Sequence, residues 1–364
     1  MDVVRFEQEF ELESGAVLPE ITIAYETYGK LSEQRDNVVW VCHALTGNAK
    51  AAEWWDGLIG PGQVLDTRQY FVVCANVLGS CYGTTGPDHV NPHTGVLYGK
   101  DFPLVTIRDM VKAHEWLRKH LEIDQIHLLI GGSLGGQQAL EWAISQPDIA
   151  RNLCVLASNA KHSAWGIAFN EAQRMAIEAD PTFHTNAPES GKEGLEAARA
   201  IAMLSYRTYS IYAEKQGETN PDKIDAFRAS SYQRYQGNKL QQRFNAYAYM
   251  TLSKAMDSHN VGRGRGGLEA ALQRVKANTL AISIGSDLLF PAAEQLFIAE
   301  HIKGASYANV DSIFGHDGFL TEYGQIAPLL DKWLHHKQSS IARVKNLHLI
   351  QSAKHLIVPG TEKF

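Results

Sequence analysis

Apolar positions follow two patterns that take turns along the first part of the chain. Short, almost wholly apolar runs cover 37–42, 70–75 and 126–130. Such runs are typical of parallel strands that are buried on both faces. Helical spacing of apolar residues covers 106–120, and good helix formers occupy 137–146. Strands and helices that alternate along the chain predict a mostly parallel, doubly wound sheet.

The N-terminal segment has a different pattern. Apolar and polar residues alternate along 6–12 and again along 21–28, and Ser14-Gly15 lies between the two runs. This period of two predicts strands with one buried face, and the small residues predict a turn between them. We therefore expect an antiparallel hairpin at the edge of a mixed sheet.

The turn-taking of strands and helices stops after an apolar run at 153–157. From there to the next strand-like run we find no convincing strand, and helical stretches occupy 163–179, 190–215 and 225–256. Strand-like runs return only at 279–285 and 305–310. A helical lid inserted into the sheet explains this interruption. Its expected bounds are 161–276, with an α/β core made of 1–160 and 277–338 and a C-terminal tail at 339–364, for which the residue pattern indicates no role.

The pattern G-x-S-x-G lies between the strand at 126–130 and the helix that follows. It reads Gly131-Gly132-Ser133-Leu134-Gly135. So tight a turn from strand to helix strains the serine backbone and tolerates only hydrogen as the side chain two residues away on either side. The pattern predicts a nucleophile elbow that exposes the Ser133 hydroxyl. The Leu134 N–H would then face a developing oxyanion at the positive end of a helix.

A serine nucleophile needs a base to remove its proton and an acid to orient that base. Asp287 follows the strand-like run at 279–285, and His316 follows the run at 305–310. Each residue also has an ordinary explanation: Asp287 as a turn residue ahead of a proline, and His316 as a loop histidine between glycines. The order serine, acid, histidine, each beyond a later strand, favours a catalytic triad in an α/β-hydrolase fold with an inserted lid.

The loop after the strand at 37–42 reads His43-Ala44-Leu45-Thr46-Gly47. An α/β-hydrolase places its second oxyanion donor in a loop at this position. We therefore expect the backbone N–H of Leu45 to take that role. An ordinary glycine-ended loop is the alternative.

Composition and charge exclude some classes of partner. The 364 residues are 45% hydrophobic, which is enough for a sizeable core, and the net charge of −6 argues against nucleic acid or an anionic membrane as a main partner. No signal peptide and no apolar run of about 18 residues is present. Four cysteines without metal-pair spacing favour reduced thiols in a cytoplasmic protein.

The glycine- and arginine-rich loop 262–267 resembles a dinucleotide fingerprint only superficially, because no strand precedes it. A flexible hinge of the lid is the favoured interpretation. Contact between this loop and the phosphates of a cofactor stays open.

Nine motifs spread over almost the whole chain resemble the homoserine O-acetyltransferase family. They are HALTG at 43–47, WWDGLIGPG at 54–62, NVLGSCYGTTGP at 76–87, DFP at 101–103, GGSLGGQQALEW at 131–142, AFNE at 168–171, RYQG at 234–237, SDLLFP at 286–291 and GHD at 315–317. Leu134 and Gln137 depart from the family, which more often has methionines at these positions. Leu134 contributes only its backbone, so the departure should be tolerated there.

The resemblance implies acetyl transfer from acetyl-CoA to the side-chain hydroxyl of L-homoserine through an acyl-serine, with no metal and no permanently bound cofactor. It also implies that Arg207 binds the acceptor carboxylate and Asp317 the acceptor ammonium. Thr46, Tyr206 and Tyr235 are weaker candidates for lining the pocket, and core packing explains the tyrosines equally well. A homodimer is expected from the same resemblance.

Two other functions stay open. One is a relative that uses succinyl-CoA as donor or serine as acceptor, and the apolar Leu288 beside the acid mildly favours the acetyl donor. The other is an esterase in which water replaces homoserine, because both chemistries use the same triad.

Overall fold

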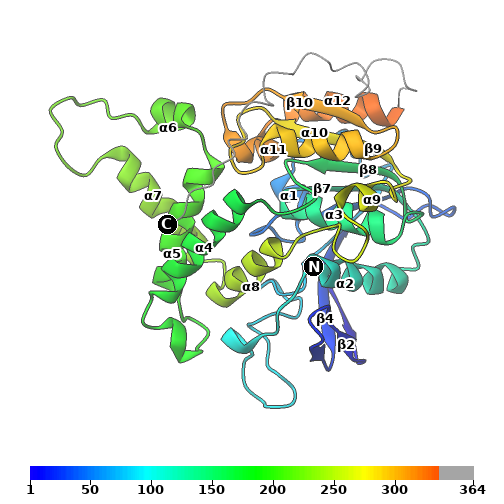
Figure 1. Ribbon diagram of the computed structural model, residues 1–364, viewed down its shortest axis with the longest axis horizontal. Helices are drawn as coiled ribbons and strands as arrows, with labels where there is room; N and C mark the ends of the chain where they lie inside the picture. The colour runs from blue at the N-terminus through cyan, green and yellow to red at the C-terminus, as the bar shows by residue number, and fades with distance from the viewer. Residues whose placement is uncertain (336–364) are drawn as a thin grey trace.

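An eight-stranded, mostly parallel sheet forms the centre of the protein in the computed structural model, which describes residues 1–335 (Figure 1). The strand order is β1-β4-β6-β5-β7-β8-β9-β10. Neighbouring strands from β6 to β10 pair in parallel, whereas β4 pairs antiparallel with both β1 and β6. The strand bounds are β1 Asp2–Phe6, β4 Ile21–Tyr28, β5 Val38–Cys42, β6 Phe71–Ala75, β7 Ile126–Gly132, β8 Ala150–Leu156, β9 Asn278–Ile284 and β10 Ser306–Val310. The expected mostly parallel sheet is confirmed.

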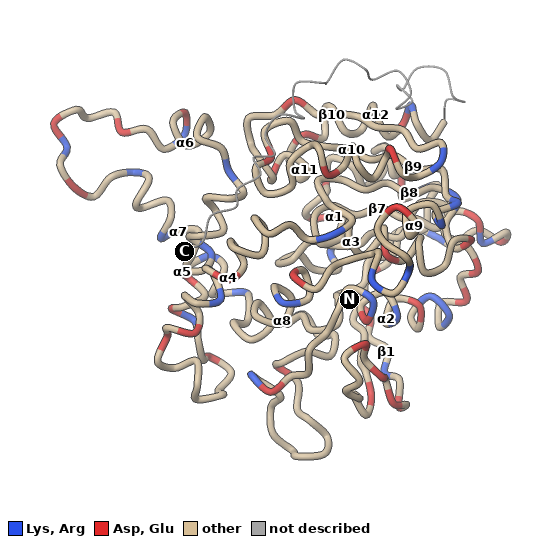
Figure 2. The backbone as a smooth tube through the Cα atoms, viewed as in Figure 1, with Lys and Arg blue, Asp and Glu red and all other residues tan. Residues whose placement is uncertain are grey.

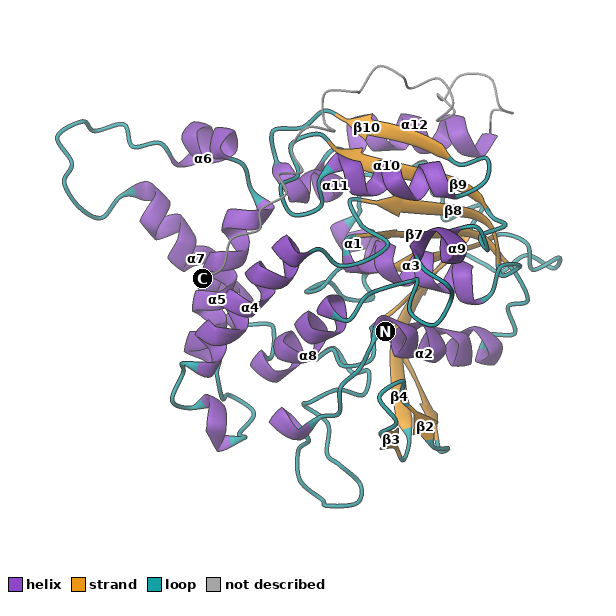
Figure 3. Ribbon diagram, in the orientation of Figure 1, coloured by secondary structure: helices purple, strands orange, loops and turns teal. Residues whose placement is uncertain are grey.

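Helices cover both faces of this sheet (Figure 3). Leu117 of α2, Leu140 of α3 and Ile298 of α10 belong to the apolar core on one face. Ala51 of α1 and Leu330 of α12 belong to the core on the other face. The bounds of the helices around the sheet are α1 Ala51–Trp54, α2 Ile107–His120, α3 Leu134–Ser145, α10 Ala292–His301, α11 Gly318–Thr321 and α12 Tyr323–His335, with 3-10 turns η1 Gly99–Asp101 and η3 Gly315–Asp317.

The first strand of the N-terminal hairpin, β1, lies earlier in the chain than expected, at Asp2–Phe6. β1 ends at Phe6, where it pairs with Ile21 of β4. Phe10–Glu11 then forms β2, which pairs with β3, Val17–Leu18, in a separate two-stranded sheet. The prediction of one strand over 6–12 was therefore wrong in part. Phe10 and Leu12 are buried in the main core, and the chain has to bend after β1 to bring them there.

Helices α4 to α9 lie between β8 and β9 in sequence, and those from α4 to α8 form a separate layer beside the sheet (Figure 1). Their bounds are α4 Ala164–Glu178, α5 Lys192–Tyr206, α6 Tyr209–Gln216, α7 Arg228–Gln241, α8 Ala246–Asp257 and α9 Leu268–Leu272, with the 3-10 turn η2 Phe183–Thr185. Two of the three expected helical stretches are each divided in two. Thr208 and Asn245 cap the second helix of each pair, accepting the Ile211 and Ala248 N–H groups.

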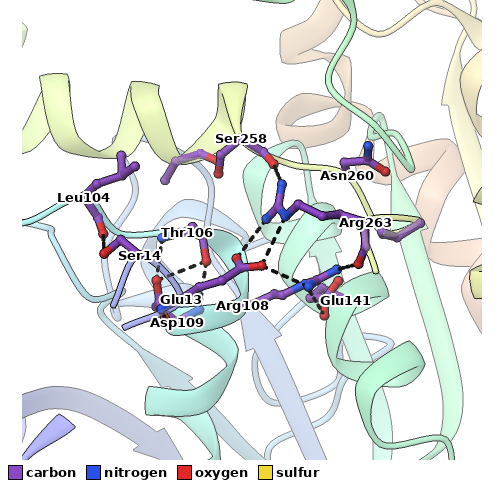
Figure 4. Close-up of polar contacts among 12 residues, drawn as sticks. Glu13, Ser14, Leu104, Thr106, Arg108, Asp109, Glu141, Ser258, Asn260 and Arg263 are labelled. Carbon is purple, nitrogen blue, oxygen red and sulfur yellow. Dashed lines mark hydrogen bonds and ion pairs between the residues drawn. The ribbon is translucent and has the colours of Figure 1, made fainter. Parts of the chain in front are cut away.

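The loop 262–267 holds the lid to the core through ion pairs. Arg263 contacts Glu13 in the N-terminal segment, which also contacts Arg108 of α2 (Figure 4). Arg265 contacts Glu141 of α3, whose side chain is only 2% exposed. Both arginines of the loop therefore have carboxylate partners in the core. The prediction of a flexible hinge has no support in these contacts.

Charged residues of both signs are scattered over the chain (Figure 2). Within residues 1–335, no helix combines the length and the apolar character needed to cross a membrane. The tail at 339–364 and the last three residues of the expected core lie outside the described residues.

Candidate active site

The elbow at Ser133 has the strained geometry that its sequence predicts. Ser133 adopts φ 57° and ψ −126° between β7 and α3. A Cβ at Gly131 would collide with the Gly135 carbonyl, and a Cβ at Gly135 would collide with the Cys42 carbonyl. The Ser133 backbone is held from both sides, because its N–H donates to Leu156 O and its carbonyl accepts from the Ser158 hydroxyl.

Ser133, His316 and Asp287 are joined by hydrogen bonds at one edge of the sheet. His316 Nε2 lies 2.9 Å from Ser133 Oγ, and His316 Nδ1 lies 2.6 Å from Asp287 Oδ2. All three residues are at most 5% exposed. The carboxyl ends of parallel strands meet at one edge, which is why residues 183 positions apart in sequence come together.

Asp287 and His316 are both fixed by further contacts. Asp287 Oδ1 accepts the backbone N–H groups of Leu289 and Phe290, at 2.8 and 2.9 Å. The His316 ring stacks on Phe290, with 5.0 Å between ring centroids, and lies against Phe319. The carboxylate therefore has one oxygen left for the imidazole. With Nδ1–H bonded to that oxygen, Nε2 is free to accept the serine proton.

The two residues expected to donate backbone N–H groups to an oxyanion both lie near Ser133. Leu134 is the first residue of α3, so its N–H has no acceptor within the helix. Leu45 follows β5 and lines the same cavity as Ser133. The structure thus places Leu134 directly after the serine and Leu45 in the wall of the same cavity, and their roles as oxyanion donors stay predictions.

His43 holds the Leu45 loop in place, a feature that sequence reasoning did not find. Its Nε2 accepts the Val77 N–H at 3.1 Å, and its Nδ1 lies 2.9 Å from Ala44 O. Burial lowers the pKa of His43 to about 4. The neutral ring therefore carries its proton on Nδ1 and donates it to the Ala44 carbonyl.

A cavity of about 290 Å³ opens above the triad. Its wall contains polar and charged side chains that could hold an amino acid, together with apolar ones that would face an acyl group. The lining residues include Ser133, His316, Asp317, Thr46, Tyr206, Arg199, Arg243, Trp54, Phe319 and Leu320. Within residues 1–335 no group of three or more metal-ligating side chains is placed to hold a metal ion.

The match to known proteins agrees with this geometry. A family model for the alpha/beta hydrolase fold matches residues 37–323. A homoserine O-acetyltransferase from Cyclobacterium marinum is 51% identical over 324 residues, which are 89% of this chain and 92% of the relative. The chain belongs to the homoserine O-acetyltransferase family. The family predicted from the sequence motifs is therefore confirmed.

The solved structures that are similar to this chain include both transferases and esterases. The crystal structure of a homoserine O-acetyltransferase from Bacillus anthracis superposes with a TM-score of 0.87 at 27% identity, covering 93% of this chain and 99% of that one. An esterase of known structure superposes with a TM-score of 0.84 at 25% identity, covering 92% and 99%. The shared fold therefore does not by itself separate transfer from hydrolysis.

The structure brings Asp317, Thr46 and Tyr206 to the cavity, but Arg207 and Tyr235 do not line it. Arg207 lines a neighbouring groove, and its Nε lies 2.7 Å from Asp317 Oδ2. Tyr235 is 59% exposed on α7. Tyr235 therefore does not line this cavity, whereas Arg207 contacts the cavity residue Asp317, and the acceptor-binding role expected of Arg207 stays a prediction. Arg207 is the C-cap residue of α5, directly after Tyr206, and the two residues line different hollows.

Two arginines that line the cavity were not predicted from the sequence. Arg199 lies with its guanidinium carbon 5.2 Å from the Tyr206 ring centroid, and Arg243 donates to Thr46 O and the Tyr82 hydroxyl. Arg199 stands eight residues, about two helical turns, before Arg207. Nothing in the residue pattern separates a pocket-lining arginine from a solvated one on so polar a lid.

Leu288 lies away from the acyl side of the cavity. It is 59% exposed, and its carbonyl accepts the Trp165 indole N–H. The apolar character of Leu288 is therefore no argument about the acyl donor. Neither Arg263 nor Arg265 lines the cavity either, because both are paired with carboxylates of the core.

Proposed function

We propose that the protein transfers an acetyl group from acetyl-CoA to the side-chain hydroxyl of L-homoserine through an acyl-enzyme on Ser133. The observation that carries the proposal is the hydrogen-bonded series Ser133, His316 and Asp287 at the cavity. The wall of the same cavity contains two arginines, Arg199 and Arg243, and the carboxylate of Asp317. The relatives in the homoserine O-acetyltransferase family support the donor and the acceptor.

In the first half-reaction, Ser133 Oγ attacks the thioester carbonyl while His316 Nε2 takes its proton. The carbonyl oxygen becomes an oxyanion, which the N–H groups of Leu134 and Leu45 stabilise. The carbon–sulfur bond then breaks, and the thiolate leaves with the proton from His316. The products are free coenzyme A and acetyl-Ser133.

In the second half-reaction, the homoserine hydroxyl gives its proton to His316 Nε2 and attacks the acetyl-serine carbonyl. The same two N–H groups bind the second oxyanion. The bond to Ser133 Oγ breaks, and His316 returns the proton to that oxygen. Asp287 keeps the imidazole in one tautomer and stabilises its positive charge in both halves, so the enzyme ends unchanged.

The acceptor is a zwitterion and needs a cation and an anion in the cavity. We assign the carboxylate to Arg199, which lines the cavity and is fixed against Tyr206. A guanidinium can hold a carboxylate by two parallel hydrogen bonds. Asp317, next to the base in sequence, is positioned for the ammonium group. Arg199 thereby replaces Arg207 in the role expected from sequence.

Hydrolysis of an ester is the second candidate, since an esterase is among the similar solved structures. Water as acceptor needs no charged recognition, whereas this cavity contains Arg199, Arg243 and Asp317. These charges favour a zwitterionic acceptor over water. The same arginines could also meet the extra carboxylate of a succinyl donor, so the acetyl donor rests on the relatives.

A donor and acceptor matrix tests the proposal. Purified protein is incubated with acetyl-CoA or succinyl-CoA, each with L-homoserine, L-serine or water alone, and thiol release and acylated product are followed. We expect fast thiol release with O-acetylhomoserine as product only for acetyl-CoA with homoserine. Equal thiol release with and without homoserine would identify a hydrolase instead.

We also propose a homodimer in the cytoplasm. Large apolar side chains on the lid are exposed, among them Met175, Leu204 and Tyr209, and these would be buried if lid helices of two copies pack together. All four cysteines are free thiols, which suits a reducing compartment. Sedimentation of the purified protein tests the dimer: a species of monomer mass at micromolar concentration would refute it.

A further inference from the structure

A groove of about 230 Å³ adjoins the catalytic cavity, because its lining residue Arg207 contacts Asp317 of the cavity. It is formed by the end of α5, one side of α6, Tyr232 of α7 and the loop that contains Phe314. Three aromatic rings line it, those of Tyr212, Tyr232 and Phe314. Tyr212 and Tyr232 meet edge to face with 5.8 Å between centroids. The groove therefore offers flat apolar surfaces of the kind on which a nucleobase stacks.

The charged residues that line the groove are both cations. Arg207 and Lys215 line it, and no carboxylate is among its lining residues. Lys215 is exposed and contacts Glu214 at 2.7 Å, a surface pair of little stability that a phosphate could replace. The groove thus combines aromatic rings with an excess of positive charge.

Arg207 has donors to spare. Its guanidinium carbon lies 5.9 Å from the Phe314 ring centroid, and its Nε approaches Asp317 without forming an aligned hydrogen bond. Its Nη groups have no hydrogen-bond acceptor among residues 1–335. A half-buried guanidinium with unused N–H groups is a ready partner for a phosphate.

A single ion pair separates the groove from the catalytic centre. Arg207 lines the groove, and its partner Asp317 lines the cavity and follows the catalytic base His316 in sequence. A ligand bound in the groove would therefore lie next to the cavity that contains Ser133. The two hollows are arranged as one would expect for the two ends of a long donor.

We infer that this groove binds the nucleotide end of the coenzyme A thioester, with the adenine on the tyrosines and the phosphates on Arg207 and Lys215. The inference rests on the proposed function, since it assumes a coenzyme A donor. A third hollow, which shares Arg243 with the cavity, fits less well, because Asp88 and Glu189 line it alongside Lys192. Its charges cancel, and it offers no excess for phosphates.

Two donors with the same reacting group separate this role from catalysis. One is acetyl-CoA, and the other is the acetyl thioester of N-acetylcysteamine, which lacks the nucleotide. Lys215→Met and Tyr232→Ala are compared with wild type, each with saturating homoserine. The matched control is Lys254→Met, which removes an exposed lysine from a different hollow of the lid.

We expect Lys215→Met to raise the KM for acetyl-CoA about five- to tenfold, and Tyr232→Ala to raise it by a similar factor. The kcat/KM for the truncated thioester should stay at the wild-type value, and Lys254→Met should change neither donor. An equal fall for both donors, or no change with acetyl-CoA, would overturn the inference. A wild type that uses the truncated thioester but not acetyl-CoA would instead refute the proposed donor, and the inference with it.

Discussion

Single residues of the site differ in how far the sequence reveals them. Ser133, Asp287 and His316 could be predicted because each follows a strand and each has a distinctive role in one order along the chain. Leu45 and Leu134 are proposed to act through their backbone N–H groups, so their positions in the motifs are enough to predict them. The cavity-lining arginines could not be predicted, because a helix surface carries many arginines and only the packing of the lid selects among them.

One experiment tests whether Arg199, rather than Arg207, binds the acceptor carboxylate. We expect Arg199→Met to raise the KM for homoserine by about tenfold or more, because a bidentate contact to the acceptor carboxylate is lost. Its kcat/KM for hydrolysis of a neutral acetyl ester should change little. Steady-state kinetics with varied homoserine measure this. An unchanged KM for homoserine in Arg199→Met would show that another cation binds the acceptor carboxylate.

We expect His43 to affect the reaction through the Leu45 loop. Its ring bridges the Val77 N–H and the Ala44 carbonyl, so His43→Leu should let the Leu45 N–H move from the oxyanion. Loss of alignment at one oxyanion donor should lower kcat by roughly tenfold or more, with little change in KM for homoserine. His93→Gln, on an exposed loop, is the control. A kcat equal to wild type in His43→Leu would show that the loop keeps its place without the ring.

At the scale of elements, buried parallel strands were the most predictable part. Every residue of β5 is buried, and the sequence there is an unbroken apolar run. The ends of elements were less predictable. β1 stops at Phe6 because tertiary packing turns the chain, and the lid helices break where Thr208 and Asn245 cap new helices. Neither break is marked by a proline or glycine at that point.

The contact between α3 and the loop 262–267 predicts a stability effect. Glu141 is 2% exposed and contacts Arg265 and, more distantly, Arg108. Glu141→Gln should leave these guanidinium groups without their charge partner and lower the free energy of unfolding by about 2–4 kcal/mol. Glu122→Gln, which breaks an exposed pair with Arg35, should cost less than about 1 kcal/mol. Urea titrations compare the two, and equal losses would contradict a clamp at Glu141.

At the scale of the whole molecule, four buried histidines tie stability to pH. Burial lowers the pKa of His43, His114 and His162 to about 4 and that of His259 to about 3. Between the ordinary histidine pKa, near 6.5, and these values, the unfolded chain binds protons that the folded chain does not. Stability is therefore full above about pH 6.5 and falls as the pH drops towards 4.

Chemical denaturation at pH 7 and pH 5 measures this loss, to which each ring can contribute up to about 2 kcal/mol at pH 5. Burial also raises the pKa of Glu294 to about 8, which opposes the trend, since its share of stability declines as the pH rises above about 4.5. One carboxyl does not offset four rings. The variant His114→Gln should lose less stability at pH 5, and identical losses in the variant and wild type would contradict the assignment.

The central claim is an acetyl group on Ser133 between two half-reactions. It is tested most directly by mass spectrometry of the protein after brief incubation with acetyl-CoA without acceptor. We predict one added acetyl group, located on Ser133 by peptide mapping, absent in Ser133→Ala and removed on addition of L-homoserine with formation of O-acetylhomoserine. Formation of that product without any acetylated Ser133, or acetylation at another residue that turns over instead, would contradict the account.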